Sequence, residues 1–156
     1  MRSTNHQGFS LIELLIVVTI IGIVASIAIP NLLASRRAAN EGSAQSSLRT
    51  IGTCEATYHY TYGNGSYTDL SGLGVKTLTD SVLASGSKSG YTFVVNPVAG
   101  TPALFWAYAI PTDTSGIGKT GTRRFALTED FVMRGDLTLS APADEAAVKA
   151  MNPVGN

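Results

Sequence analysis

The chain has 156 residues, of which 44% are hydrophobic and only 14% charged, with 11 basic and 11 acidic side chains. The charged fraction is well below the roughly 25% of ordinary soluble domains, which indicates that part of the chain is unusually apolar. The equal numbers of opposite charges argue against a basic surface for nucleic acid, and the single cysteine, Cys54, excludes an intramolecular disulfide.

An apolar segment of 21 residues runs from Phe9 to Ile29 and contains one charge, that of Glu13. As an α-helix it would be about 31 Å long, which matches the hydrocarbon thickness of a bilayer. It is apolar on every face, whereas a core helix of a soluble protein carries one apolar stripe. It is also longer than the apolar part of a secretory signal peptide. We therefore predict a membrane-spanning helix over residues 9–30.

Glu13 is the exception within this segment. A carboxylate at the centre of a membrane helix costs roughly 2.5–3.5 kcal/mol on insertion scales, and less near the interface. Two interpretations stay open from this residue alone. Either the carboxylate reaches the water of the lipid headgroups, or it is kept for a cationic partner.

The arrangement around Glu13 is more specific than any of its parts. A short polar leader ends at Gly8, Phe9 follows it, Glu13 is the fifth residue counted from Phe9, and the apolar run ends at Pro30. This arrangement resembles the class III signal of type IV pilins and of type II secretion pseudopilins.

The resemblance implies how the chain is processed and assembled. A prepilin peptidase would cut between Gly8 and Phe9 and N-methylate the new amino group of Phe9. Glu13 would then pair with the Phe9 ammonium of a neighbouring subunit as the inner-membrane machinery assembles the filament. Removing one partner of a buried ion pair often costs about 3–5 kcal/mol. The pair would therefore fix the register between subunits.

The same resemblance implies a location. The precursor is expected in the bacterial inner membrane, surrounded by lipid, with its leader in the cytoplasm and its large domain outside. After processing it is expected in an extracellular filament or in a periplasmic pseudopilus.

Pro30 separates the apolar segment from a second helical segment. Proline lacks an amide hydrogen and clashes with the carbonyl four residues earlier, that of Ser26. We predict a kink rather than a helix end, because residues that favour helices resume at once. Gly22 and Pro30 are the expected weak points, since Gly costs about 1 and Pro about 3 kcal/mol in a helix interior. The resemblance implies that this region can unwind in a filament.

Residues 31–62 predict an amphipathic helix. Five apolar side chains share one face of it and should pack against a sheet: Ala44, Leu48, Ile51, Tyr58 and Tyr62. Cys54 borders this face. The helix should stop at the turn signal of residues 63–66. Asn64 also begins a glycosylation acceptor pattern there, which we interpret as a plain turn.

The remaining residues, 63–156, predict a small globular domain. A long loop over residues 66–89 with one short turn of helix leads to strands over 91–95, 103–110, 122–128 and 131–135. Over 103–110, Leu104, Trp106, Tyr108 and Ile110 alternate with small residues and Phe105. One short helix is expected near the C-terminus. The predicted fold is therefore α+β, with a long N-terminal helix, membrane-spanning in its first half, packed on a small four-stranded antiparallel sheet.

The sequence offers no catalytic, cofactor-binding or metal-binding set. The segment GIGKTG, residues 116–121, satisfies G-x-G-x-x-G, but a strand-like run follows it where a dinucleotide fingerprint needs a helix. His6 lies in the leader, and His59 lies among tyrosines on the predicted helix. We therefore interpret residues 116–121 as a loop and predict that the chain is not an enzyme.

Four segments are predicted: a cleaved leader over 1–8, a membrane-spanning and filament-core helix over 9–30, an amphipathic helix over 31–62, and a globular domain over 63–156. The function that follows from the resemblance is that of a structural subunit of a type IV pilus-like filament, which polymerises with copies of itself. Cell adhesion, motility, DNA uptake and conduction all stay open as the role of the fibre. The alternatives are a secretion pseudopilin and a minor pilin with a binding or adhesion role. The paired cysteines of many pilins and the acidic calcium loop of many pseudopilins are both missing. Two alternatives from other functional classes are a membrane-anchored enzyme and a membrane-anchored ligand-binding module.

Overall fold

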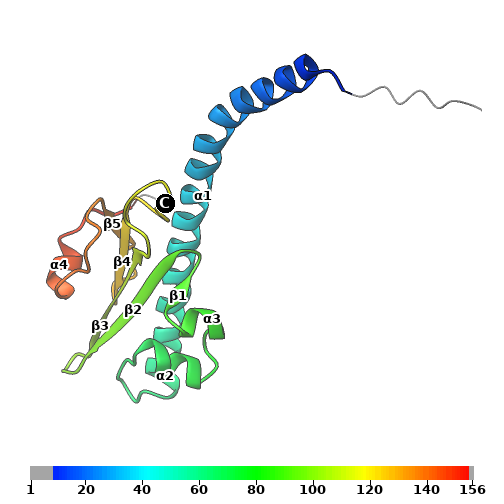
Figure 1. Ribbon diagram of the computed structural model, residues 1–156. Coiled ribbons are helices and arrows are strands. Elements are labelled where there is room, and N and C mark those ends of the chain that lie inside the picture. Colours follow the sequence, from blue (N-terminus) through cyan, green and yellow to red (C-terminus); the bar gives the residue numbers. More distant parts are fainter. Residues whose placement is uncertain (1–8, 155–156) are drawn as a thin grey trace, which may run out of the picture. The chain divides into compact units, whose positions relative to one another are not determined.

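The computed structural model describes residues 9–154, and the chain divides into two compact units, residues 1–35 and 36–156 (Figure 1). Helix α1, Leu11–Thr61, contributes to both units. The larger unit adds a sheet and three short helices. The predicted leader, with Gly8 at its end, lies outside the described residues.

Helix α1 is continuous over 51 residues and passes through Pro30. It is followed by a turn in which Asn64 and Gly65 have positive φ angles of 45° and 87°. The amide of Gly63 donates to the Tyr58 carbonyl at 2.7 Å, which satisfies a carbonyl of the last helical turn. The helix thus stops where the turn signal of residues 63–66 predicted.

The face of α1 that enters the core is the predicted one. Cys54 is buried beside it, and three members of the predicted stripe are fully buried: Ala44, Leu48 and Ile51. Tyr58 packs against this core. The prediction that Tyr62 belongs to the core is wrong, because this residue follows the helix end and is 51% exposed, with the Lys76 ammonium 5.0 Å from its ring centre.

The glycine- and serine-rich segment after α1 contains two short helices where one was predicted. These are α2, Leu70–Val75, and α3, Ser81–Ala84. The carboxylate of Asp69 accepts a bond from the Gly72 amide at 2.8 Å, and that of Asp80 accepts one from the Leu83 amide at 2.8 Å. These N-caps stabilise helices whose composition alone favours a loop.

The sheet is an antiparallel meander of five strands in the order β1-β2-β3-β4-β5. The strands are β1, Ser87–Lys88; β2, Tyr91–Val98; β3, Leu104–Pro111; β4, Arg124–Thr128; and β5, Arg134–Asp136. The α+β prediction is confirmed with five strands instead of four. The additional strand β1 has two residues and pairs only with the start of β2.

The prediction that a strand begins at Phe131 is wrong, because β5 begins at Arg134. The Asp130 carboxylate accepts bonds from the Thr128 hydroxyl at 2.8 Å and from the Val132 amide at 2.9 Å. These bonds form a turn in which Phe131 has a φ of 58°. A chain in that conformation cannot continue as a strand.

The two faces of the sheet are covered differently (Figure 1). The predicted alternation along β3 is confirmed, with three buried residues on the face toward α1: Phe105, Ala107 and Ala109. The opposite face carries α4, Glu145–Lys149, which is the short helix predicted near the C-terminus. There Val148 packs with the half-buried rings of Trp106 and Tyr108. Residues 112–123, which include GIGKTG, connect β3 to β4 as a loop.

Candidate functional site

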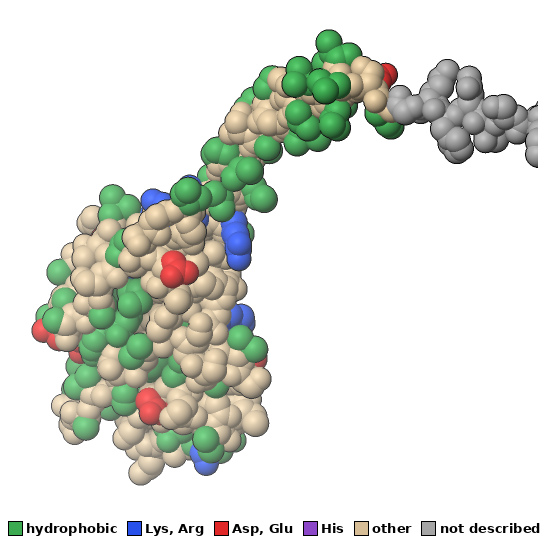
Figure 2. Space-filling view, in the orientation of Figure 1, with side chains coloured by type: hydrophobic (Ala, Val, Ile, Leu, Met, Phe, Trp, Pro, Cys, Tyr) green, Lys and Arg blue, Asp and Glu red, His purple; other side chains and the backbone are tan. Residues whose placement is uncertain are grey.

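The first part of α1 exposes large apolar side chains at successive positions along the helix, and Figure 2 shows them on the visible face. A window of 18 residues has a mean hydropathy of 2.8, and none of it is buried. Exposure reaches 83% at Leu11 and is still 68% at Leu32. A surface of this kind needs lipid or protein around it, and the helix is long and apolar enough to cross a membrane.

Glu13 lies in the first turn of this helix and contacts the chain just before it. Its Oε2 accepts a hydrogen bond of 2.8 Å from the Ser10 amide, while the Ser10 hydroxyl accepts one of 3.2 Å from the Ile12 amide. This is a capping box, in which Ser10 is the N-cap and Glu13 the third helical residue. Sequence reasoning missed Ser10, although the pattern Ser-x-x-Glu before an apolar run signals such a box.

Phe9 is the first described residue and is 91% exposed. The structure therefore places Glu13 in the first turn of α1 and Phe9 and Ser10 directly before it, while Gly8 lies outside the described residues. Both amide hydrogens that the box satisfies belong to the unpaired first turn of α1.

The predicted weak points of the helix, Gly22 and Pro30, are both within continuous α1. A Cβ added at Gly22 would meet nothing within 4 Å. The hydroxyls of Thr19 and Ser26 donate to the carbonyls of Leu15 and Ile23, each at 2.7 Å. Such bonds within the helix satisfy polar groups in an apolar environment. The role of Gly22 and Pro30 in unwinding stays a prediction.

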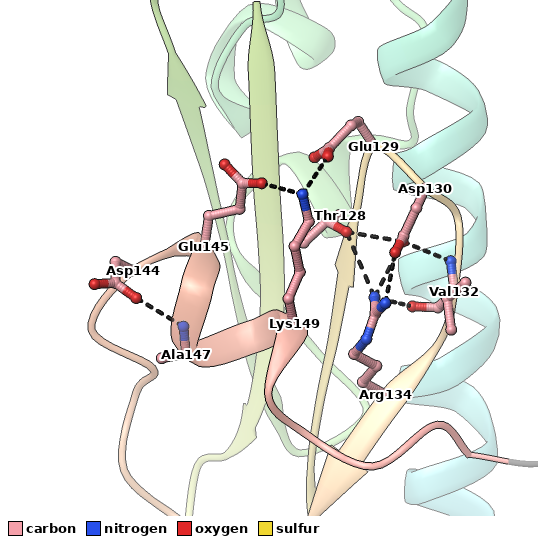
Figure 3. Close-up of polar contacts among 9 residues, drawn as sticks. All are labelled: Thr128, Glu129, Asp130, Val132, Arg134, Asp144, Glu145, Ala147 and Lys149. Atoms are coloured by element: carbon pink, nitrogen blue, oxygen red, sulfur yellow. Dashed lines mark hydrogen bonds and ion pairs between the residues drawn. The ribbon is translucent and has the colours of Figure 1, made fainter.

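Ion pairs hold the C-terminal part of the larger unit, which has no disulfide (Figure 3). Asp130 accepts two bonds from the Arg134 guanidinium, at 3.0 and 2.5 Å, which help to lower the Asp130 pKa to about 2. Lys149 of α4 pairs with Glu129 at 2.6 Å and also with Glu145. The end of the chain is thus tied to the β4–β5 turn by charge.

His59 does not form part of a catalytic arrangement within residues 9–154. Its ring stacks on Tyr67, with centres 4.6 Å apart, and meets the Tyr60 ring edge-on. It lies with Glu129 in the wall of a groove of about 750 Å³. Glu129 is bound to Lys149, and the described residues contain no cluster of three metal-binding side chains. The Nδ1 of His59 has no hydrogen-bond partner among the described residues, so it is not bonded to a hydroxyl group of this groove.

Residues 3–29 match the family described as the prokaryotic N-terminal methylation motif. The matched segment contains Gly8, Phe9, Glu13 and Gly22. Over 125 residues the chain is 37% identical to the type IV wide pilus major component of Thermus thermophilus, a match that covers 76% of this chain and 90% of that protein. The chain belongs to the type IV pilin and pseudopilin family.

Two further relatives match this pilin-family chain over shorter segments. It is 42% identical over 54 residues to the type IV major pilin of Myxococcus xanthus, covering 35% of this chain and 24% of that protein. It is 41% identical over 49 residues to the type II secretion system core protein G of Escherichia coli, covering 31% of this chain and 34% of that protein. No solved structure matches the chain significantly. The family resemblance seen in the sequence is confirmed.

Proposed function

We propose that the chain is a structural subunit of a type IV pilus-like filament. The observation that carries this proposal is the 37% identity to a wide pilus major component over 90% of that protein's length. The exposed apolar surface of α1 supports it, because a subunit outside the membrane needs other subunits to cover that surface. Proteins of this family are structural subunits, and we assign the chain no enzymatic activity.

The proposed processing begins at the junction of Gly8 and Phe9. A prepilin peptidase cuts there and methylates the new amino group of Phe9, which the match to an N-terminal methylation motif supports. The leader over 1–8 is then lost, residues 9–30 form the membrane-spanning and later filament-core helix, residues 31–62 the amphipathic helix, and residues 63–156 the globular domain. The precursor is held in the inner membrane and the product is an extracellular filament.

Glu13 is the residue that we propose for assembly. Its Oε2 accepts the Ser10 amide bond, so the other carboxylate oxygen can accept the Phe9 ammonium of a neighbour while the helix stays capped. In an apolar bundle an unpaired carboxylate is strongly disfavoured, which selects the register that supplies a cation. Gly22 and Pro30 would let the helix adjust within the filament.

The second candidate is a pseudopilin of a type II secretion system, which the 41% identity to core protein G over 49 residues supports. A minor pilin with an adhesive role is a third form of the same subunit. Electron microscopy of sheared cell-surface material, with intact-mass spectrometry, distinguishes these candidates. Long fibres containing a chain that begins at methylated Phe9 support the pilin. A secretion defect on deletion, without fibres, favours the pseudopilin, and assembled chains that retain residues 1–8 contradict the processing.

A further inference from the structure

The loop between β3 and β4 has an exposed apolar tip. Residues 112–118 are all exposed, and Ile117 is 80% exposed between Gly116 and Gly118. A Cβ built on either glycine would meet nothing within 4 Å, so the tip packs against no other part of the described chain. A large apolar side chain held in this way is suited to a contact outside the chain.

The base of the loop is closed and fixed. The Thr120 amide donates to the Asp113 carbonyl at 2.9 Å, and the Asp113 amide donates to the Thr120 hydroxyl at 3.2 Å. From α1, the Asn40 side-chain amide donates to the Thr120 carbonyl at 2.9 Å. These three bonds hold residues 113–120 as a closed loop. Asp113 and Thr120 form its neck, and Ile117 lies at its tip.

Four cationic residues lie close along the chain to the segments that form this neck. On α1, Arg36 and Arg37 lie one turn before Asn40 and Glu41, and the other two cations are in the loop segment, Lys119 and Arg123. Figure 2 shows Lys and Arg side chains gathered at this end of the larger unit. Two carboxylates lie among them. Glu41 is only 8% exposed and already accepts bonds from Thr122 and Arg123, whereas Asp113 begins the neck. The accessible charge at this end is therefore mainly positive.

The chain limits how far this neck can lie from the end of the predicted membrane span. Ten residues, 31–40, separate the end of that span from Asn40. They span about 15 Å as a helix and at most about 35 Å if extended. An apolar tip beside several cations is the combination by which proteins bind the surface of a bilayer that contains anionic lipids.

We propose that residues 112–119 form a membrane-contact loop, in which Ile117 enters the interfacial layer and Lys119, with Arg36 and Arg37, binds anionic headgroups. The proposal rests on the membrane-anchored precursor of the proposed function. The contact holds the globular unit against the bilayer before assembly, and it is given up when the subunit leaves the membrane.

A fluorescent probe on the full chain in nanodiscs tests the contact. An environment-sensitive dye on Ser115→Cys reports on the loop, and the native Cys54 is buried and therefore poorly reactive. In discs of phosphatidylcholine mixed with phosphatidylglycerol, we expect the emission to shift to the blue and a soluble quencher to lose access. Ile117→Ser should abolish both effects. Lys119→Gln should lower the ratio of docked to undocked loop about five-fold.

The chain offers a matched control position. Val75 is also 80% exposed and is followed by Lys76, but it lies near Tyr62, where α1 has already ended. A dye on Val75→Cys should stay in water. Equal shifts at the two positions would overturn the proposal, and so would an unchanged signal in Ile117→Ser. A shift that appears in detergent at high protein concentration, without lipid, would also overturn it, because it would indicate a second copy of the chain as the partner.

The same experiment separates this inference from the proposed function. A chain that inserts into the discs while its Ser115 probe stays in water contradicts the membrane-contact loop alone. A chain that fails to insert contradicts the membrane-anchored precursor, and with it both proposals.

Discussion

The Glu13 carboxylate accepts a hydrogen bond of 2.8 Å from the Ser10 amide, one turn before it. The carboxylate in the apolar segment is therefore already used within its own chain, as part of the helix cap. A carboxylate near a helix N-terminus is also favoured by the helix dipole. The single charge of this segment thus has a local reason to exist, in addition to any partner that assembly provides.

These two roles of Glu13 can be separated by substitution. Gln at this position retains the capping box but removes the charge, whereas Ala removes both. If the ion pair drives assembly, Glu13→Gln and Glu13→Ala should both be cleaved normally and both fail to form filaments. Immunoblots of processed chain and electron microscopy of sheared material would measure this. Filaments of normal abundance in Glu13→Gln would show that the cap, and not the charge, is what assembly requires.

The helix and the sheet could be predicted because their signals are local. The stripe of Ala44, Leu48 and Ile51 recurs at helical spacing, and the alternation around Phe105 marks a strand. The same apolar segment is a candidate membrane span by its length and its single charge, and its crossing of a membrane stays a prediction.

The parts that could not be predicted depend on side chains meeting across the fold. Strand β1 exists only because two residues pair with β2, and its sequence resembles a loop. The start of β5 is displaced because Asp130 bonds to Val132 and forces Phe131 into a turn conformation. The exposure of Ile117 at a loop tip could likewise not be predicted, because the sequence shows an apolar residue but not whether other residues cover it.

Two glycines of α1 should respond oppositely to alanine. Gly42 has open space around it, so Gly42→Ala should stabilise the larger unit by about 1 kcal/mol through better helix propensity. At Gly52 a Cβ would lie 2.7 Å from Leu127 Cδ2 and 3.1 Å from the Phe131 ring. Gly52→Ala should therefore destabilise it, by about 1–3 kcal/mol. Denaturant unfolding of the full chain in detergent, followed by Trp106 fluorescence, compares the two. A stabilised Gly52→Ala would contradict the packing of α1 on β4.

The ion pairs of the C-terminal part should differ in their contribution to stability. Arg134 is only 9% exposed, so Asp130→Ala leaves a buried cation unpaired and should cost about 3 kcal/mol. Lys149 is far more exposed, and Lys149→Ala should cost less than about 1 kcal/mol. The same unfolding measurement tests both variants. Equal losses would mean that burial does not distinguish these pairs. Because its pKa is lowered from 3.8 to about 2, the contribution of Asp130 should be fully present above about pH 4 and be lost as the pH falls from there through about 2.

A buried carboxylate on α1 should make the stability depend on pH near neutrality. Glu55 is fully buried, and burial raises its pKa from 4.5 to about 7, although the Thr68 amide donates to its Oε2 at 3.2 Å. Between these two values the unfolded chain has released its proton and the folded chain retains it. The folded state therefore loses stability as the pH rises from about 4.5 through about 7, by about 3 kcal/mol in all, and the loss is complete above that value.

Glu55→Gln keeps an oxygen for the Thr68 amide and removes the ionisation, so its stability should stay nearly constant where that of the unsubstituted chain falls. Glu41 does not interfere, because hydrogen bonds from Thr122 and Arg123 outweigh burial and lower its pKa. Its contribution is present above the usual pKa of a carboxylate and is lost as the pH falls below that value. Urea unfolding of both chains in detergent at pH values from about 4.5 to about 8 measures the difference. Parallel pH curves would show that Glu55 is not the group that titrates.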